Sequence, residues 1–351
     1  MLALASYAAF GLAVHWLAGY WATVDRFGDN HLYAGIAAAL RGGDLRAVGW
    51  GKHFWGLPAA AAGVGVLTGL GDLAAILAVS MAASLASIAL AERLWGGRVA
   101  ALFAVINWPW IHGSVLGGTE TLFVALLTGS FWAARRDRWA LAGLLAALSG
   151  ITRPVGVLAV ISVAGVLLWR RQWHRLAAAV AATVAVGGLH AVSFQVAFGD
   201  PFANLRGYQG EWAGSWPIGF PFVTLARGFL ESKEPWTNTA KILVWVVLVL
   251  AGGAAMLLRP RFRRYARTHP PEALFAALAF AFLWIYNAQK WSWAEFPRFA
   301  IPVLPFALYA VEDWWPRSRL LLWAMALGSA MLAAASAVNA RYAWEQFRQL
   351  W

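Results

Sequence analysis

The sequence contains no cysteine and few charged residues, and both absences narrow the classes of protein it can encode. Without cysteine there are no disulfides, no thiolate nucleophiles and no cysteine-ligated metals. Charged residues make up 13% of the chain and hydrophobic residues 61%, with a mean hydropathy of +0.60. Because a soluble protein carries about a quarter charged residues, the composition predicts an all-α polytopic membrane protein.

Apolar segments recur along the chain, and the first 24 residues contain no Asp, Glu, Lys or Arg. A membrane-crossing helix needs roughly 20 apolar residues. We predict about 11 transmembrane helices in a single transmembrane domain, residues 1–351, with the first span retained rather than cleaved as a leader. The predicted spans are 3–23, 72–94, 97–112, 120–134, 139–151, 155–170, 176–198, 240–258, 273–288, 299–313 and 319–338. Residues 57–70 are apolar but too short to span, and we expect an interfacial or re-entrant helix there.

Charge along the chain predicts which side of the membrane each loop occupies. Short turns on one side hold 15 of the 28 Lys and Arg residues, and the positive-inside rule makes that side cytoplasmic. These turns explain the net charge of +12 without nucleic acid. The outer side holds 11 of the 16 carboxylates and two long loops, 25–71 and 199–239. Long loops on a rigid scaffold often carry function, so we expect the active site on the outer face.

An acidic segment follows the first span. Asp25 and Asp29 arrive within five residues, followed by His31 and Tyr33. One interpretation is that Asp29 caps an interfacial helix over residues 31–41. The other is that one of the two carboxylates is a general base for an acceptor hydroxyl.

Two short outer turns hold further candidate residues. In the first, His112 precedes a Gly117–Gly118 helix break, and Glu120 stands at the restart. Glu120 is either an ordinary first-turn carboxylate or part of the outer cavity. In the second turn, Thr-Arg-Pro-Val-Gly, Arg153 either snorkels toward the interface or faces a phosphate at headgroup depth.

A late outer loop combines cations with aromatic residues. Lys290 and Arg298 flank two tryptophans and a phenylalanine just before a proline-rich span. An aromatic belt explains the rings equally well. The alternative is a pocket for an anionic lipid head, with Arg298 on the phosphate.

Taken in order, these motifs resemble the GT-C superfamily of integral-membrane glycosyltransferases. They are the acidic segment with Tyr33, the Thr-Glu-x-x-Phe turn, the Thr-Arg-Pro-x-Gly turn and the Pro-Arg-Phe-x-x-Pro-x-x-Pro run. The pattern is most similar to polyprenyl-phosphate-sugar-dependent mannosyltransferases, including bacterial relatives of the GPI mannosyltransferases, and it covers about residues 1–315.

The resemblance implies a function for these residues. Such enzymes move a sugar, here expected to be mannose, from a polyprenyl-phosphate donor to an acceptor hydroxyl on the outer face of the bacterial plasma membrane, with inversion. The acceptor is a glycolipid, a glycan or a protein. The first outer loop supplies the catalytic carboxylate, Asp29 or Asp25, and no metal or other cofactor is required. The substrate-binding candidates are Arg153, Arg298, Glu120, Tyr33, Lys290, His31 and His112.

Three other functions compete with this prediction. They are a lipid-linked glycan ligase or polymerase, a transporter or flippase of lipid-linked sugar, and a non-catalytic scaffold subunit. A transporter usually places ionisable residues in mid-span. The spans of this chain hold almost none away from their ends, which favours the enzyme.

Overall fold

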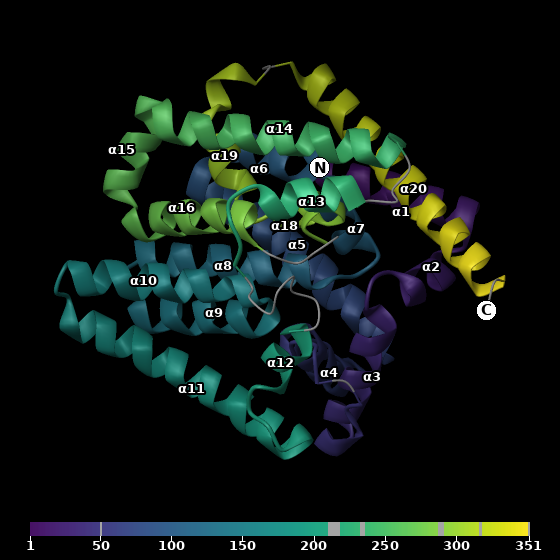
Figure 1. The fold of residues 1–351 in the computed structure, drawn as a ribbon, viewed down its shortest axis with the longest axis horizontal. Helices are drawn as coiled ribbons and strands as arrows, with labels where there is room; N and C mark the ends of the chain where they lie inside the picture. The colour runs from purple at the N-terminus through teal and green to yellow at the C-terminus, as the bar shows by residue number, and fades with distance from the viewer. Residues whose placement is uncertain (50, 210–217, 232–235, 287–290, 316–317, 350–351) are drawn as a thin grey trace. The chain divides into compact units, whose positions relative to one another are not determined.

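A computed structural model describes residues 1–49, 51–209, 218–231, 236–286, 291–315 and 318–349 (Figure 1). In these ranges the regular structure is helical, and strand pairing is limited to one isolated bridge between Ile218 and Tyr286. The all-α prediction is confirmed. The described chain divides into two compact units. The single transmembrane domain stays a prediction.

The first unit comprises residues 1–50, 55–125 and 314–351. Its helices are α1 (Leu2–Ala18), α2 (Tyr20–Arg26), α3 (Asn30–Arg41), η1 (Leu45–Ala47), α4 (Gly56–Thr68), α5 (Asp72–Trp95), α6 (Gly97–Ile106), α7 (Trp108–Val115), the start of α8 (Thr119–Arg135) and α20 (Arg319–Gln349). Residues 57–68 of the apolar segment 57–70 belong to one helix, α4, and its interfacial or re-entrant placement stays a prediction.

Three predicted spans are broken. The first bends by 97° at Gly19, whose φ of 73° favours glycine. The predicted span 97–112 is two helices, because Asn107 leaves helical geometry and its side chain caps α7 by accepting from Trp110 N at 3.1 Å. In the predicted span 299–313, the helix α19 covers only Leu304–Ala310.

A buried polar chain ties three helices of the first unit together. Trp110 Nε1 of α7 donates to the Tyr7 hydroxyl of α1 at 2.8 Å. That hydroxyl is 2.9 Å from Ser84 Oγ of α5, which is 2.7 Å from Ser114 Oγ of α7. Buried polar groups are stable when their hydrogen bonds are satisfied. This chain therefore fixes α1, α5 and α7 in one register.

The second unit comprises residues 51–54 and 126–313. Besides the end of α8, its helices are α9 (Trp139–Thr152), η2 (Pro154–Gly156), α10 (Val157–Trp169), α11 (Trp173–Phe198), α12 (Ala203–Gln209), α13 (Val223–Glu231), α14 (Trp236–Leu258), α15 (Pro260–Thr268), α16 (Pro270–Ile285), α17 (Trp291–Ala294), α18 (Phe296–Phe299), α19 (Leu304–Ala310) and most of η4 (Glu312–Trp314).

Helices α9, α10 and α11 pack side by side in the second unit (Figure 1). A Cβ atom on Gly143 of α9 would lie only 2.3 Å from the Ala179 carbonyl oxygen of α11, so this approach needs glycine. Small residues that allow close backbone contact are typical of helix packing in membranes.

Helix lengths agree with a multi-pass membrane protein. Four helical segments of the described chain are long and apolar enough to cross, or six if each bent pair is one span. The four are 72–95, 173–198, 238–258 and 319–338, and the pairs are α1 with α2 and α7 with α8. Five shorter apolar helices accompany them. The count of eleven stays a prediction.

Candidate active site

The acidic segment after α1 forms a tight corner between α2 and α3. Asp25 is exposed in the last turn of α2, and Gly28 turns the chain with a φ of 54°. Asp29 is half-buried at the N-cap position of α3, but its side chain accepts no capping hydrogen bond from that helix. Asp29 therefore occupies the N-cap position that the capping interpretation predicts, without the side-chain hydrogen bond of a cap, and it is better enclosed than Asp25.

Asn30, which the sequence analysis did not single out, fixes this corner. Its buried side-chain amide donates to the carbonyl oxygens of Val24 at 2.8 Å and Leu116 at 2.7 Å. Leu116 precedes the break between α7 and α8, where Gly117 has a φ of 92°. The residue beside Asp29 is thus tied directly to the segment that leads to Glu120. In the sequence, the only sign of the contact between Asn30 and Leu116 is the asparagine that directly follows Asp29.

The α7–α8 break buries the Glu120 carboxylate. The two helices meet at 101°, and Glu120 is 4% exposed in the first turn of α8. A Cβ atom on Gly118 would lie 2.8 Å from Glu120 Oε2, so glycine leaves the space that this carboxylate occupies. The structure thereby brings the Asp29 and Glu120 segments together through Asn30, and the predicted break at Gly117–Gly118 is confirmed.

Replacing Gly118 by alanine tests this packing. The added methyl group must displace the Glu120 carboxylate, and overpacking typically costs about 1–3 kcal/mol. We expect Gly118→Ala to lower both the unfolding temperature and the activity. Gly63→Ala is the matched control, because nothing lies within 4 Å of a Cβ there. Thermal unfolding of both variants in one detergent is the measurement, and equal unfolding temperatures would contradict the packing described.

The other candidates of the first unit occupy different environments. His112 is buried between the rings of Phe10 and Phe27, and its Nε2 lies 2.7 Å from the Ala333 carbonyl oxygen. This setting favours a packing role for the ring. Tyr33 is buried and His31 is exposed. Substrate binding by these three residues stays a prediction.

In the second unit, Arg153 sits in a turn that only glycine can close. Arg153 ends α9 with a half-buried side chain, and its carbonyl oxygen accepts from Gly156 N at 2.9 Å. A Cβ atom on Gly156 would lie 2.4 Å from the Ser149 carbonyl carbon. The Thr-Arg-Pro-Val-Gly motif is therefore a tight turn that fixes the backbone of Arg153 between α9 and α10.

Arg298 lies on the short helix α18, beside aromatic rings. Its guanidinium is 3.4 Å from the Glu295 carboxylate, and both side chains are about one-third exposed. Trp284 packs on Phe296 with ring centroids 5.4 Å apart. The buried indole nitrogens of Trp284 and Trp293 find no hydrogen-bond partner among the described residues. A buried donor without a partner is unfavourable by about 1–3 kcal/mol, so such donors suit a ligand oxygen. Lys290 lies outside the described residues.

A polar cluster at the first outer loop was missed by the sequence analysis. Lys52 Nζ lies 5.3 Å from the ring centroid of Tyr208, and the Phe54 ring stacks on His190. His190 Nε2 is also 3.2 Å from Asn204 Nδ2. Residues 51–54 of the first loop therefore pack against α11 and α12 of the second unit. These residues are more than 130 positions apart, and no local pattern predicts their contact.

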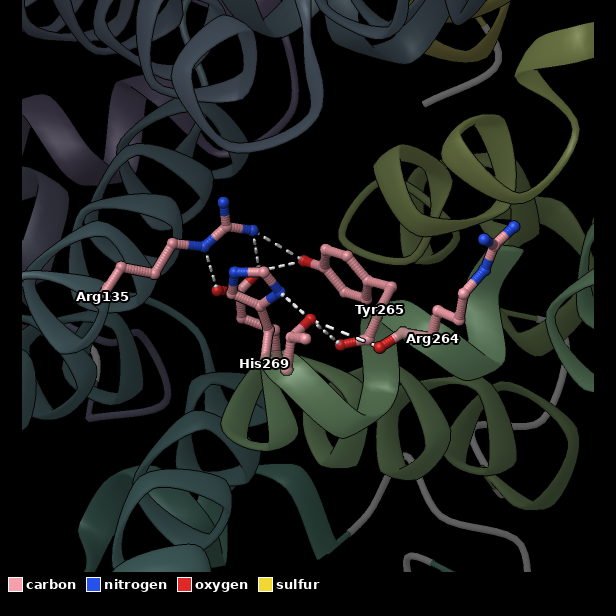
Figure 2. A network of polar contacts seen from close by, with 6 residues as sticks. Arg135, Arg264, Tyr265 and His269 are labelled. Atoms are coloured by element: carbon pink, nitrogen blue, oxygen red, sulfur yellow. Dashed lines mark hydrogen bonds and ion pairs between the residues drawn. The ribbon is translucent and has the colours of Figure 1, made fainter. Parts of the chain in front are cut away.

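In the second unit, the basic end of α8 contacts α15 and α16 through the polar network shown in Figure 2. Arg135 at the end of α8 donates to both carboxylate oxygens of Glu272, from Nε at 2.6 Å and from Nη2 at 2.8 Å. Tyr265 of α15 donates its hydroxyl to the same carboxylate. Burial, together with the Arg135 charge, lowers the pKa of His269 from its ordinary 6.5, against the opposing effect of Glu272. The ring is therefore neutral at pH 7.

These features define a helical membrane protein in which each unit carries its own group of candidate residues. Asp29 and Glu120 supply carboxylates in the first unit, and Arg153 and Arg298 supply cations in the second. No group of three or more His, Asp or Glu residues that could hold a metal occurs in the described ranges.

The sequence model of glycosyltransferase family 87 matches residues 54–286, and the chain belongs to that family. Its long apolar helices are those of an integral, multi-pass membrane protein. No curated protein sequence matches it.

Solved structures support the fold. The chain is similar to ArnT from Cupriavidus metallidurans bound to undecaprenyl phosphate, with 18% identity and a TM-score of 0.57. It is also similar to the apo state of the same ArnT, with 19% identity and a TM-score of 0.52. Both matches cover 95% of this chain and 63% of ArnT, so the chain spans less than two thirds of that protein. The match to glycosyltransferase family 87 confirms the glycosyltransferase resemblance inferred from sequence, and these structures support the fold.

Proposed function

We propose that this protein transfers a sugar from a polyprenyl-phosphate donor to an acceptor hydroxyl at the outer face of the membrane. The observation that carries the proposal is the match to glycosyltransferase family 87. The similarity of the fold to an ArnT structure that holds undecaprenyl phosphate supports a lipid-phosphate donor. The sugar is proposed to be mannose, on the motif resemblance alone.

The chemistry follows from the residue types present. Asp29 accepts the proton of the acceptor hydroxyl, and the acceptor oxygen forms a bond to the anomeric carbon of the donor sugar. The bond from that carbon to the phosphate oxygen breaks on the opposite face, so the configuration inverts. The polyprenyl phosphate leaves with the bonding electron pair and needs no general acid. We propose that the reaction is metal-independent.

Arg153 and Arg298 are proposed to hold the donor phosphate. Each is a half-buried cation on a short, rigid segment, and an arginine fork pairs well with phosphate oxygens. Arg298 is held at 3.4 Å by Glu295, a long contact that a phosphate can replace. The unpartnered indole donors of Trp284 and Trp293 suit oxygens of the same ligand.

Removing the Arg298 guanidinium tests the phosphate role. We expect Arg298→Ala to raise the KM for the donor by about tenfold or more, the loss of a charge-assisted hydrogen-bonded contact. The unfolding temperature should change little, because the side chain is one-third exposed. Steady-state kinetics with varied donor measures the effect. An unchanged donor KM with a reduced unfolding temperature would assign Arg298 to structure instead.

A vesicle assay separates transfer from transport. Purified protein is reconstituted with polyprenyl-phosphate-linked radiolabelled mannose and acceptor lipids. The proposal predicts free polyprenyl phosphate and labelled glycolipid in equal amounts. Movement of intact donor across the bilayer without bond cleavage would instead support a flippase.

A further inference from the structure

A pocket at the basic end of the second unit suggests a second ligand site, separate from the proposed catalytic residues. It has a volume of about 450 Å³ and is lined mainly by α15, with Tyr309 of α19 and Asp313 of η4 opposite. The arginine-rich turn that contains α15 is on the side that the positive-inside rule makes cytoplasmic. The pocket is thus predicted to open at the inner leaflet.

The helix α15 divides its residues sharply between two faces. Phe262 and Tyr265 are buried against the unit, whereas Arg263, Arg264 and Arg267 are exposed. An amphipathic helix with basic residues on its polar face is typical of a membrane surface. α15 also connects α14 and α16 directly (Figure 1), so it lies where a membrane-crossing helix ends and the next begins.

The two arginines of the pocket differ in their freedom to bind a ligand. Arg261 is an anchored part of the wall, because it pairs with Glu312 and with Asp313 at 3.0 Å and lies 4.5 Å from the Tyr309 ring centroid. The Arg264 guanidinium points away from the Arg135–Tyr265 network in Figure 2. None of the ion pairs between described residues involves Arg264. Arg264 is therefore the cation available to a ligand.

The end of α14 that leads into α15 exposes apolar side chains. Leu257 and Leu258 close α14 immediately before α15 and are 72% and 69% exposed. Arg263 Nε donates to the Leu257 carbonyl oxygen at 3.1 Å, which holds α15 against the end of α14. Exposed leucines beside exposed arginines present an apolar surface and a positive charge together. Basic pockets between membrane helices on the cytoplasmic side are suited to anionic lipid heads.

We propose that this pocket binds the phosphate of an anionic phospholipid of the inner leaflet, with Arg264 as the main phosphate ligand. Thr268 also lines the pocket, and its hydroxyl is already engaged with the Arg264 and Tyr265 carbonyl oxygens, at 3.3 Å and 3.0 Å. The bound lipid would hold the α14–α15–α16 turn at the membrane surface, whether or not sugar transfer occurs.

The test is lipid binding to the purified full chain, followed by native mass spectrometry. Dioleoyl phosphatidylglycerol and dioleoyl phosphatidylcholine are titrated separately, and inorganic phosphate is added alone and as a competitor. We expect selective retention of phosphatidylglycerol, resistant to millimolar phosphate. Arg264→Gln should weaken this binding about tenfold, the size expected for one charge-assisted contact. Arg264→Lys, which keeps the charge, should restore part of it.

Arg138→Gln is the matched control, because it removes the same charge from an exposed position in another basic turn. It should bind phosphatidylglycerol as the wild type does. Equal losses in Arg138→Gln and Arg264→Gln, or equal binding of the two lipids, would overturn the site. Binding of inorganic phosphate without retention of phosphatidylglycerol would overturn the lipid assignment. None of these outcomes depends on glycosyltransferase activity.

Discussion

Asp29→Asn is expected to lower the rate of sugar transfer by about 10²–10⁴-fold, the usual contribution of a positioned general base. Asparagine keeps the shape of the side chain but accepts no proton from the acceptor hydroxyl. The variant should unfold near the wild-type temperature, because asparagine is as favourable as aspartate at the N-cap position that this residue occupies. The loss should appear in kcat, with little change in donor KM. Initial rates at saturating donor, together with thermal unfolding, measure both.

Two further variants complete the Asp29 test. Asp44→Asn is the control, because Asp44 is an exposed carboxylate in the same outer loop that caps η1 by accepting from Arg46 N and Ala47 N. The Asp44→Asn variant should transfer sugar at the wild-type rate. Asp25→Asn examines the competing assignment, since Asp25 is exposed on α2. Full loss in Asp25→Asn with activity retained in Asp29→Asn would move the base to Asp25.

Glu272→Ala is expected to lower the free energy of unfolding by about 3–5 kcal/mol, the usual result of removing one partner of a buried ion pair. The Glu272 side chain is 2% exposed, and it receives hydrogen bonds from Arg135 and Tyr265. Its removal leaves the Arg135 charge without its carboxylate and the Tyr265 hydroxyl without its acceptor. The intrinsic tryptophan fluorescence of purified protein in one detergent reports the unfolding transition.

Arg175→Gln is the control for this prediction. Arg175 pairs with Asp137 at 2.6 Å, but the side chains are 43% and 59% exposed. Exposed ion pairs contribute only about 0–1 kcal/mol. The unfolding transition should therefore stay near that of the wild type. Similar destabilisation by Glu272→Ala and Arg175→Gln would show that burial does not set the strength of these pairs.

Local sequence signals predicted much of the fold. Apolar length marked α5 and α11 within a few residues, because a membrane helix is defined by its own composition. The Gly117–Gly118 break was predicted from two adjacent glycines. The breaks at Gly19 and Asn107 were missed, because each lies in an apolar run whose hydropathy gives no sign of a bend.

The candidate site was less predictable, because its geometry depends on contacts distant in sequence. Motif order indicated a resemblance to GT-C glycosyltransferases, and Asp29 and Glu120 were recognised singly. Their connection through Asn30 and Leu116, 86 positions apart, follows only from the folded chain. The Arg135–Glu272 pair spans 137 positions, and neither residue has a local motif. The packing of residues 51–54 against α11 and α12 is of the same kind.

The release of polyprenyl phosphate from a radiolabelled polyprenyl-phosphate-mannose donor tests the central claim most directly. It is measured in nanodiscs that hold purified wild-type protein or Asp29→Asn, with and without acceptor lipid. The account predicts release by the wild type that depends on acceptor and equals the glycosidic bonds formed, and almost none by the folded variant. Release at the wild-type rate by Asp29→Asn, or an intact donor with the wild type, would contradict it.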